Sequence, residues 1–253
     1  MKYLLLSLVV VALVLGNSYS GHAQSEITLI APGAIGAAVN QLTLSFEQKT
    51  GLKVKGTFGP GLKTMQQVIQ GEPFDVSIVT PPYPELLASG NVVASSATPL
   101  VSVAIGVAVR KGAPKPDIST PQAVKQMLLA AKSISYPDAA QTIAGVRVEE
   151  ALKKLGITEQ MEPKIKRGRG GSGAMAFVAK GEADIGLAVL SEMTDPGVDV
   201  IGTLPREIST PPSFVGFVSA HAKDPAAAKA LLDYLSSPDA AAAYKAHGMQ
   251  PAH

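Results

Sequence analysis

Short β-rich runs alternate with helical segments along the first third of the chain, and this alternation limits the fold more than any other feature. The helical segments carry apolar residues at three- and four-residue spacing, such as Val39, Leu42 and Phe46, and each ends near a glycine. A β-α-β-α-β order is the unit of a parallel sheet with crossover helices. The predicted strands are residues 25–31, 52–58 and 75–79, and the predicted helices are 37–50 and 62–69.

A long apolar run at residues 100–110 separates this unit from a second α/β unit, and a strand at 214–218 follows the second unit. The run is long for one strand, so we expect it to cross between two lobes. The predicted fold is α/β with two lobes, and each lobe has a mainly parallel sheet flanked by helices. Residues 24–104 and 214–253 are predicted to form lobe 1, and residues 105–213 lobe 2. Such a fold places a ligand in the cleft between the lobes.

The first 23 residues have the pattern of a secretory signal peptide. A cationic start precedes about thirteen apolar residues, and small residues follow up to Ala23, after which we expect cleavage. The apolar run is shorter than the ~20 residues that span a bilayer. We therefore expect a mature protein in the periplasm.

Composition excludes several classes of function. The chain has no cysteine and only four histidines, at positions 22, 221, 247 and 253. Thiolate chemistry is thus excluded, and a histidine-based metal site or catalytic triad is poorly supplied. The net charge is +2, without the basic runs of a nucleic-acid-binding protein. We expect a monomer with no metal, no cofactor and no nucleic acid partner.

Four glycine-rich turns lead into predicted helices, at residues 32–36, 59–63, 139–145 and 168–173. The first amides of a helix lack internal partners and favour an anion, and glycine lets the backbone approach it closely. The turns thus predict a small anionic ligand, although glycine before a helix also serves ordinary turn geometry. Arg169 could bind a carboxylate with its guanidinium. The alternative for this basic segment, residues 164–169, is a solvated loop.

Other side chains in or after these segments are weaker candidates of the same kind. They are Lys63, Thr80 and Arg147 as ligand contacts, with Tyr136 and Asp138 at the end of a predicted strand. The last two could line the cleft or could be ordinary strand-end structure. Neither the turn at residues 33–36 nor the stretch at 168–173 is a nucleotide-binding fingerprint, because the full strand–GxGxxG–helix–acid pattern is missing, and so is GxxxxGK[ST].

Several segments resemble the molybdate-binding-protein group of bacterial ABC-importer solute-binding proteins. They are ITLIAPGAIGAAVNQLTLSFEQKTGLKV at 27–54, GEPFDVSIV at 71–79, GVRVEEALKKLG at 145–156, GAMAFVAKGEADIGLAV at 173–189 and SSPDAAAAYKAHGM at 236–249. The resemblance implies a type II periplasmic-binding-protein fold, a hinged cleft, an oxyanion ligand and an ABC-importer permease as partner.

The resemblance also implies where the ligand binds. The family holds molybdate with serine hydroxyls in the first two turns and a tyrosine after a late strand, and these positions carry Ala34, Gly61 and Val189 here. The loss of three hydroxyl donors favours an organic carboxylate over molybdate. The full set of expected ligand contacts is Gly33, Ala34, Gly59, Gly61, Lys63, Thr80, Ala144, Arg169, Gly171, Ser172 and Val189.

The chain is similar to aconitate isomerase as well, which moves a proton and a double bond in a tricarboxylate. Such chemistry needs a positioned base and cationic groups that hold the substrate. Asp138 or Tyr136 would be the base in that case. The primary expectation is a periplasmic substrate-binding protein without catalytic activity, and a periplasmic isomerase of an organic acid is the alternative.

Overall fold

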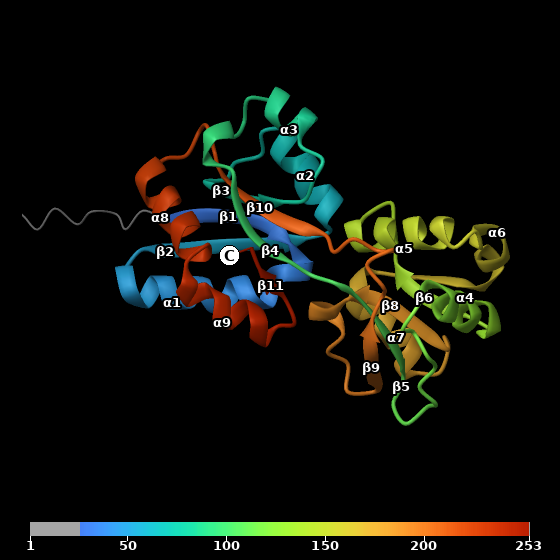
Figure 1. Ribbon diagram of the computed structural model, residues 1–253. Coiled ribbons are helices and arrows are strands. Elements are labelled where there is room, and N and C mark those ends of the chain that lie inside the picture. Colours follow the sequence, from blue (N-terminus) through green and yellow to red (C-terminus); the bar gives the residue numbers. More distant parts are fainter. Residues whose placement is uncertain (1–25, 253) are drawn as a thin grey trace, which may run out of the picture.

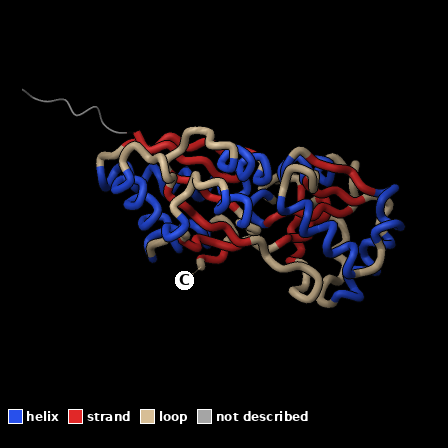
Figure 2. Tube along the Cα trace, turned by 90° about the horizontal axis from the view of Figure 1, so that it is seen from above, coloured by secondary structure: helices blue, strands red, loops and turns tan. Residues whose placement is uncertain are grey.

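The computed structural model describes residues 26–252, which fold into two α/β lobes placed side by side (Figures 1 and 2). The predicted signal peptide, residues 1–23, lies outside the described residues. Each lobe is built on one sheet, with strand order β11-β4-β10-β3-β1-β2 in the first and β7-β6-β8-β5-β9 in the second. The expected two-lobed α/β architecture is therefore confirmed.

The first sheet contains strands from both ends of the described chain. Its strands are β1 (Glu26–Pro32), β2 (Lys53–Gly59), β3 (Val76–Val79), β4 (Thr98–Ser102), β10 (Ser213–Val218) and β11 (Gln250–Pro251). Around it lie α1 (Gly36–Thr50), α2 (Gly61–Ile69), α3 (Pro84–Ala88), α8 (Pro225–Leu235), α9 (Pro238–Ala246) and the 3₁₀ turns η1 (Gly33–Ile35) and η2 (Ala94–Ser96).

The second sheet is formed by the middle of the chain. Its strands are β5 (Ile105–Arg110), β6 (Ile134–Pro137), β7 (Ile165–Gly168), β8 (Ile185–Val189) and β9 (Val198–Thr203). The helices of this lobe are α4 (Pro121–Ala130), α5 (Ile143–Lys154), α6 (Thr158–Met161) and α7 (Gly170–Ala179), with the 3₁₀ turns η3 (Glu162–Lys164) and η4 (Leu190–Glu192).

Both sheets are mixed, which corrects the expectation of mainly parallel sheets. In the first sheet β1 pairs in parallel with β2 and β3, whereas β10 pairs antiparallel with β3 and β4. In the second sheet β6 pairs in parallel with β7 and β8, whereas β5 pairs antiparallel with β8 and β9. The parallel pairs belong to the β-α-β units, and the antiparallel strands lie next to the two points where the chain passes between the lobes.

Those two crossings join the lobes. The predicted long strand at residues 100–110 is divided into β4 and β5, which belong to different sheets. The chain returns between β9 and β10 through residues 204–212 (Figure 1). Val103 and Leu204, one in each crossing, are buried. The lobe boundaries themselves, residues 24–104 with 214–253 and residues 105–213, stay a prediction.

Local sequence signals account for most helix ends. Helix α1 buries Val39, Leu42 and Phe46 and stops at Gly51, whose φ of 76° is the left-handed conformation that glycine adopts easily. At the start of α4 the Thr120 hydroxyl accepts a hydrogen bond from Ala123 N–H. The Asp224 carboxylate caps α8 in the same way.

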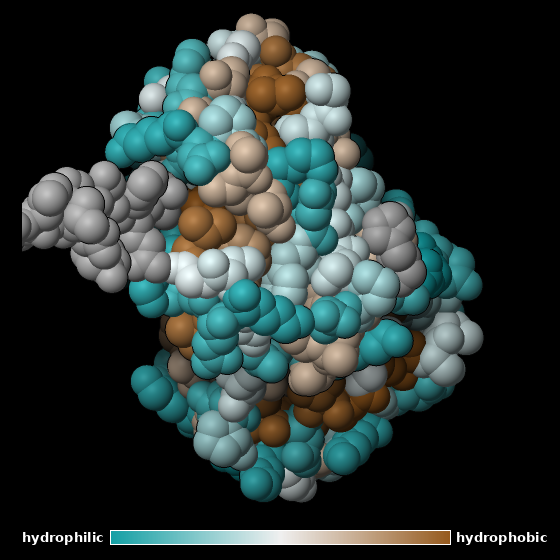
Figure 3. All heavy atoms as spheres, turned by 90° about the vertical axis from the view of Figure 1, so that its left-hand side faces the viewer, coloured by the Kyte–Doolittle hydropathy of each residue, from teal (hydrophilic) through white to brown (hydrophobic). Residues whose placement is uncertain are grey.

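The outer face of the first lobe is turned to the viewer in Figure 3. Its hydrophobic residues lie in several patches separated by hydrophilic ones. Among residues 26–252 there is no helix that is both long and apolar enough to cross a membrane.

Candidate functional site

A cavity of about 270 Å³ lies where four helix starts from the two lobes meet. The first lobe contributes residues before α1 and α2, and the second lobe contributes residues before α5 and α7 together with the end of η4. All four of the predicted glycine-rich turns contribute to its wall. The residues around the cavity are Pro32, Gly33, Ala34, Gly59, Pro60, Gly61, Asp138, Gln141, Thr142, Ile143, Ala144, Arg169, Gly170 and Glu192.

The helices at the cavity differ in how their first amides are satisfied. Helices α1, α2 and α7 begin without a side-chain hydrogen bond from their own N-cap residue. Only α5 is capped by its own N-cap side chain, because the Thr142 hydroxyl accepts from Gly145 N–H at 3.1 Å. Helix starts present N–H groups and the positive end of the helix dipole, although Gly171 N–H of α7 already donates to Glu192 and Leu62 N–H of α2 donates to the Gln141 carbonyl oxygen. The cavity wall thus favours a negatively charged group without a cluster of basic side chains.

Two direct hydrogen bonds join the lobes beside the cavity. Leu62 N–H, in the first turn of α2, donates to the Gln141 carbonyl oxygen at 3.1 Å. The Ser191 hydroxyl, on η4, donates to the Ala34 carbonyl oxygen at 2.6 Å. Because each bond connects one lobe to the other, the structure is a closed form in which the two lobes are in contact beside the cavity.

Three charged side chains line the cavity, namely Arg169, Asp138 and Glu192. The Asp138 carboxylate accepts hydrogen bonds from Ala140 N–H at 3.0 Å and from the Gln141 side-chain amide at 3.1 Å. These bonds, that from Ala140 first, lower the pKa of Asp138. Asp138 therefore carries its charge at neutral pH and has its oxygens engaged with its own loop.

Glu192 is in the opposite situation. Burial raises the pKa of its carboxyl group, and the single hydrogen bond from Gly171 N–H, at 3.2 Å, opposes that rise only in part. The chain thus holds a desolvated acid at the cavity wall, close to the start of α7.

Six of the expected ligand contacts line this cavity, and five do not. Gly33, Ala34, Gly59, Gly61, Ala144 and Arg169 belong to the wall. Lys63 is exposed on α2, Gly171 and Ser172 lie in the first turn of α7, and Val189 is completely buried in β8. Thr80 is buried and lines a separate cavity with Pro81 and Pro82. The assignment of a ligand-binding role to any of these residues stays a prediction.

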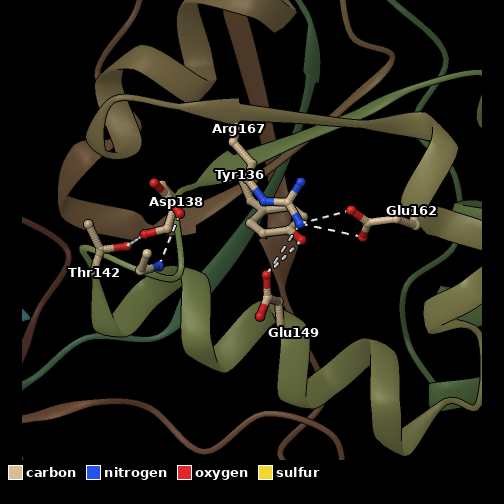
Figure 4. A network of polar contacts seen from close by, with 7 residues as sticks. Tyr136, Asp138, Thr142, Glu149, Glu162 and Arg167 are labelled. Atoms are coloured by element: carbon tan, nitrogen blue, oxygen red, sulfur yellow. Dashed lines mark hydrogen bonds and ion pairs between the residues drawn. The ribbon is translucent and has the colours of Figure 1, made fainter.

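Of the two residues named as a possible base, only Asp138 lies at the cavity. Tyr136 is fully buried, and its hydroxyl donates to Glu149 at 3.3 Å (Figure 4). The Arg167 guanidinium lies over the Tyr136 ring, 6.0 Å from its centroid, and contacts Glu162 at 3.2 Å. Burial, followed by the charge of Glu149, raises the pKa of Tyr136 far above its usual value. These contacts place Tyr136 in a network beside the cavity wall, away from the ligand space.

In the basic segment at 164–169, one side chain holds neighbouring backbone in place and another lines the cavity. Lys164 donates to the carbonyl oxygens of Leu129 and Ala131 at 2.7 and 2.9 Å, so it joins η3 to the end of α4. Arg169 alone of this segment reaches the cavity. Arg147, the other basic candidate, forms an ion pair with Glu150 at 2.6 Å. The alternative interpretation of this segment as a loop is wrong for residues 165–168, which form β7.

Sequence reasoning missed Glu192 and Ser191. Both follow β8 directly, and an acid and a hydroxyl just beyond a buried strand are the signal that could have identified them. Within residues 26–252, no group of three or more histidine, aspartate and glutamate side chains is arranged to hold a metal ion.

Comparison with known proteins finds similar sequences over nearly the whole described chain. Residues 27–250 match the family model described as bacterial extracellular solute-binding protein. The chain is 34% identical over 241 residues to an aconitate isomerase from Pseudomonas sp, covering 90% of this chain and 88% of that protein. It is 31% identical over 248 residues to the molybdate-binding protein ModA of Azotobacter vinelandii, covering 96% of this chain and 97% of that protein.

Solved structures show the same fold. The periplasmic molybdate-binding protein of Azotobacter vinelandii superposes with a TM-score of 0.73 at 19% identity, covering 88% of this chain and 98% of that chain. The sulfate-binding protein SubI from Mycobacterium tuberculosis superposes with a TM-score of 0.68 at 20% identity, covering 90% of this chain and 87% of that chain. Both likenesses support a type II periplasmic-binding-protein fold.

Proposed function

The chain belongs to the bacterial extracellular solute-binding protein family, and on that premise we propose that it captures a small anion for an ABC importer. The observation that carries the proposal is the convergence of four helix starts from two lobes on one cavity. Helix starts attract anions, and a cavity between lobes can close around its ligand. At about 270 Å³, the cavity is near the lower end of the sizes known for ligand sites, so it suits a small ligand.

The chemistry of the wall favours an organic carboxylate over a fully inorganic oxyanion. Arg169 is the one basic side chain among the residues that line the cavity, and its guanidinium suits a planar carboxylate. Ala34 and Gly61 offer no hydroxyl group to a ligand. The curated ModA relative is a molybdate-binding protein by name, so molybdate is the first competitor to test.

We place the mature protein in the periplasm, following removal of residues 1–23, with an ABC-importer permease as its membrane partner. The family description, extracellular solute-binding protein, supports an exported protein of this kind. We propose that it acts as a monomer, because each lobe contributes its part of the cavity from the same chain.

Isothermal titration of the mature protein against molybdate, sulfate, citrate, malate and succinate tests the proposal. At least one carboxylate should bind more tightly than molybdate. The substitution Arg169→Gln should weaken carboxylate binding about tenfold or more, because a charge-assisted hydrogen bond contributes roughly 1.5–3 kcal/mol. Lys153→Gln removes the same charge from an exposed position on α5 and serves as the control. Binding of none of the five anions would refute the proposed function.

The alternative is a periplasmic isomerase of an unsaturated organic acid. It is favoured by the 34% identity to an aconitate isomerase and by two carboxyl groups, Asp138 and Glu192, that face the same cavity as Arg169. Proton transfer within a substrate needs such a group close to a cationic anchor. NMR of cis- or trans-aconitate incubated with the mature protein distinguishes the two functions. Conversion that is absent at micromolar protein would eliminate this substrate.

A further inference from the structure

Glu192 is the most unexpected group at the cavity. It ends η4, three residues after β8, and its side chain lies directly on the first turn of α7. A Cβ added at Gly171 would lie 2.6 Å from the Glu192 Cβ and 2.7 Å from its Oε2, so Gly171 leaves room for this carboxyl group and no more. Glu192 is thus held against the helix start where an anion would otherwise be expected.

The bonding of Glu192 leaves capacity for a partner. Its Oε1 accepts the hydrogen bond from Gly171 N–H, and within residues 26–252 its Oε2 accepts none. No ion pair joins Glu192 to Arg169 or to another described basic residue. An ionised carboxylate has about four acceptor positions and no donor. A ligand placed in the cavity therefore meets an acceptor whose needs are largely unfilled.

The charges around the cavity also favour a ligand that donates a hydrogen bond to Glu192. When ionised, Glu192 and Asp138 together place two negative charges opposite the single positive charge of Arg169. A dianion with no proton would add like charge beside Glu192 and would leave the carboxylate unpaired. A ligand with a hydroxyl group or a protonated acid oxygen satisfies Glu192 and can still present a charged group to Arg169.

We propose that Glu192 selects anions that also carry a hydrogen-bond donor, a hydroxyl group or a protonated acid oxygen, and excludes oxyanions without one. The inference rests on the proposed function as an anion receptor and names its ligand class. Hydroxy acids and monohydrogen phosphate belong to the selected class, whereas sulfate, molybdate and simple dicarboxylates belong to the excluded one.

Two matched pairs of probes isolate the donor. Malate is succinate with one added hydroxyl group, and monohydrogen phosphate is close to sulfate in shape but carries a proton. Wild-type protein should bind malate more tightly than succinate and phosphate more tightly than sulfate. A buried group that needs a partner can discriminate by a factor of 10⁴ or more, so we expect at least about a tenfold preference in each pair. Titration calorimetry at about neutral pH measures all four affinities.

The substitution Glu192→Gln separates ligand selection from a purely structural role. Glutamine keeps an acceptor oxygen for Gly171 N–H, so the cap of α7 can persist while the charge is removed. In this variant both preferences should shrink at least about threefold, mainly because succinate and sulfate bind more tightly. Glu159→Gln, at an exposed position on α6, removes a like charge far from the cavity and should preserve both ratios.

The pH dependence of sulfate binding adds a second measurement. Sulfate gains no proton between about pH 5 and pH 8, so a change in its affinity reports on the protein. Burial raises the pKa of Glu192, whereas hydrogen bonds lower the pKa of Asp138, the other carboxyl group at the cavity. Sulfate should therefore bind wild type more weakly as pH rises and Glu192 ionises, and this trend should be lost in Glu192→Gln.

The outcomes distinguish this inference from the function on which it rests. If at least one probe binds wild type but the two ratios stay the same in Glu192→Gln, the inference is overturned and the anion receptor stands. If none of the four probes binds at millimolar concentration, the inference is overturned, and the receptor function is overturned with it only when molybdate and citrate also fail to bind.

Discussion

The hydrogen bond from Ser191 to the Ala34 carbonyl oxygen should control how readily the lobes separate. The bond is 2.6 Å long and joins η4 of one lobe to η1 of the other. Ser191→Ala removes the donor and leaves the carbonyl oxygen unpaired in the closed form, whereas water can reach both groups when the lobes part. The substitution should therefore shift molecules toward the open form.

The expected size follows from the strength of one bond. A hydrogen bond contributes a net 0.5–1.5 kcal/mol in general, which corresponds to an approximately 2- to 13-fold change in the ratio of closed to open molecules. Since the ligand binds the closed form, its apparent dissociation constant should rise by up to the same factor. The effect is greatest when closed molecules are a minority without ligand.

Single-molecule FRET measures the change directly. The chain has no cysteine, so Leu44→Cys on α1 and Leu129→Cys on α4 give two exposed labelling positions, one on each lobe. Ser191→Ala should move the distribution toward lower transfer. Ser45→Ala, whose hydroxyl bonds the Gln41 carbonyl oxygen within α1, is the control. An unchanged distribution in Ser191→Ala would refute the reasoning that this bond holds the lobes together.

Three further substitutions test local packing and charge. Gly171→Ala should lower the melting temperature, because its Cβ would lie 2.6 Å from the Glu192 Cβ. Gly173→Ala meets only ordinary contacts at 3.6 Å and should raise it by helix propensity. At neutral pH, Asp75→Asn should lower the free energy of unfolding by about 1–3 kcal/mol. Burial opposes ionisation of Asp75, but hydrogen bonds, those from Thr28 first, outweigh it and lower the pKa, so this stabilisation exists above the usual pKa and fades in acid. Urea denaturation should show the wild-type advantage at neutral pH shrinking in acid, and a constant difference would contradict the charge argument.

The sequence determined the elements whose signals are local. Apolar spacing and Gly51 fix α1, and Thr120 with Pro121 fixes the start of α4, because these features act within one or two turns of chain. The turn predicted at residues 168–173 overlaps the start of α7 at Gly170, because the low helix propensity of glycine hides a helix start from the sequence. There the helix start is supported by Glu192, a residue 21 positions along the chain.

The candidate site divides in the same way. The sequence alone indicated four glycine-rich turns and Arg169, because a helix start is specified by residues close to it in the sequence. Only the tertiary structure decided which side chains share the cavity, since that depends on where separate strands end in space. It brought in Glu192 and Ser191, turned Tyr136 toward Glu149, and left Val189 buried in β8. Short-range sequence signals thus determined where the helices start along the chain. Long-range packing determined which charged groups and hydrogen-bond donors face the cavity.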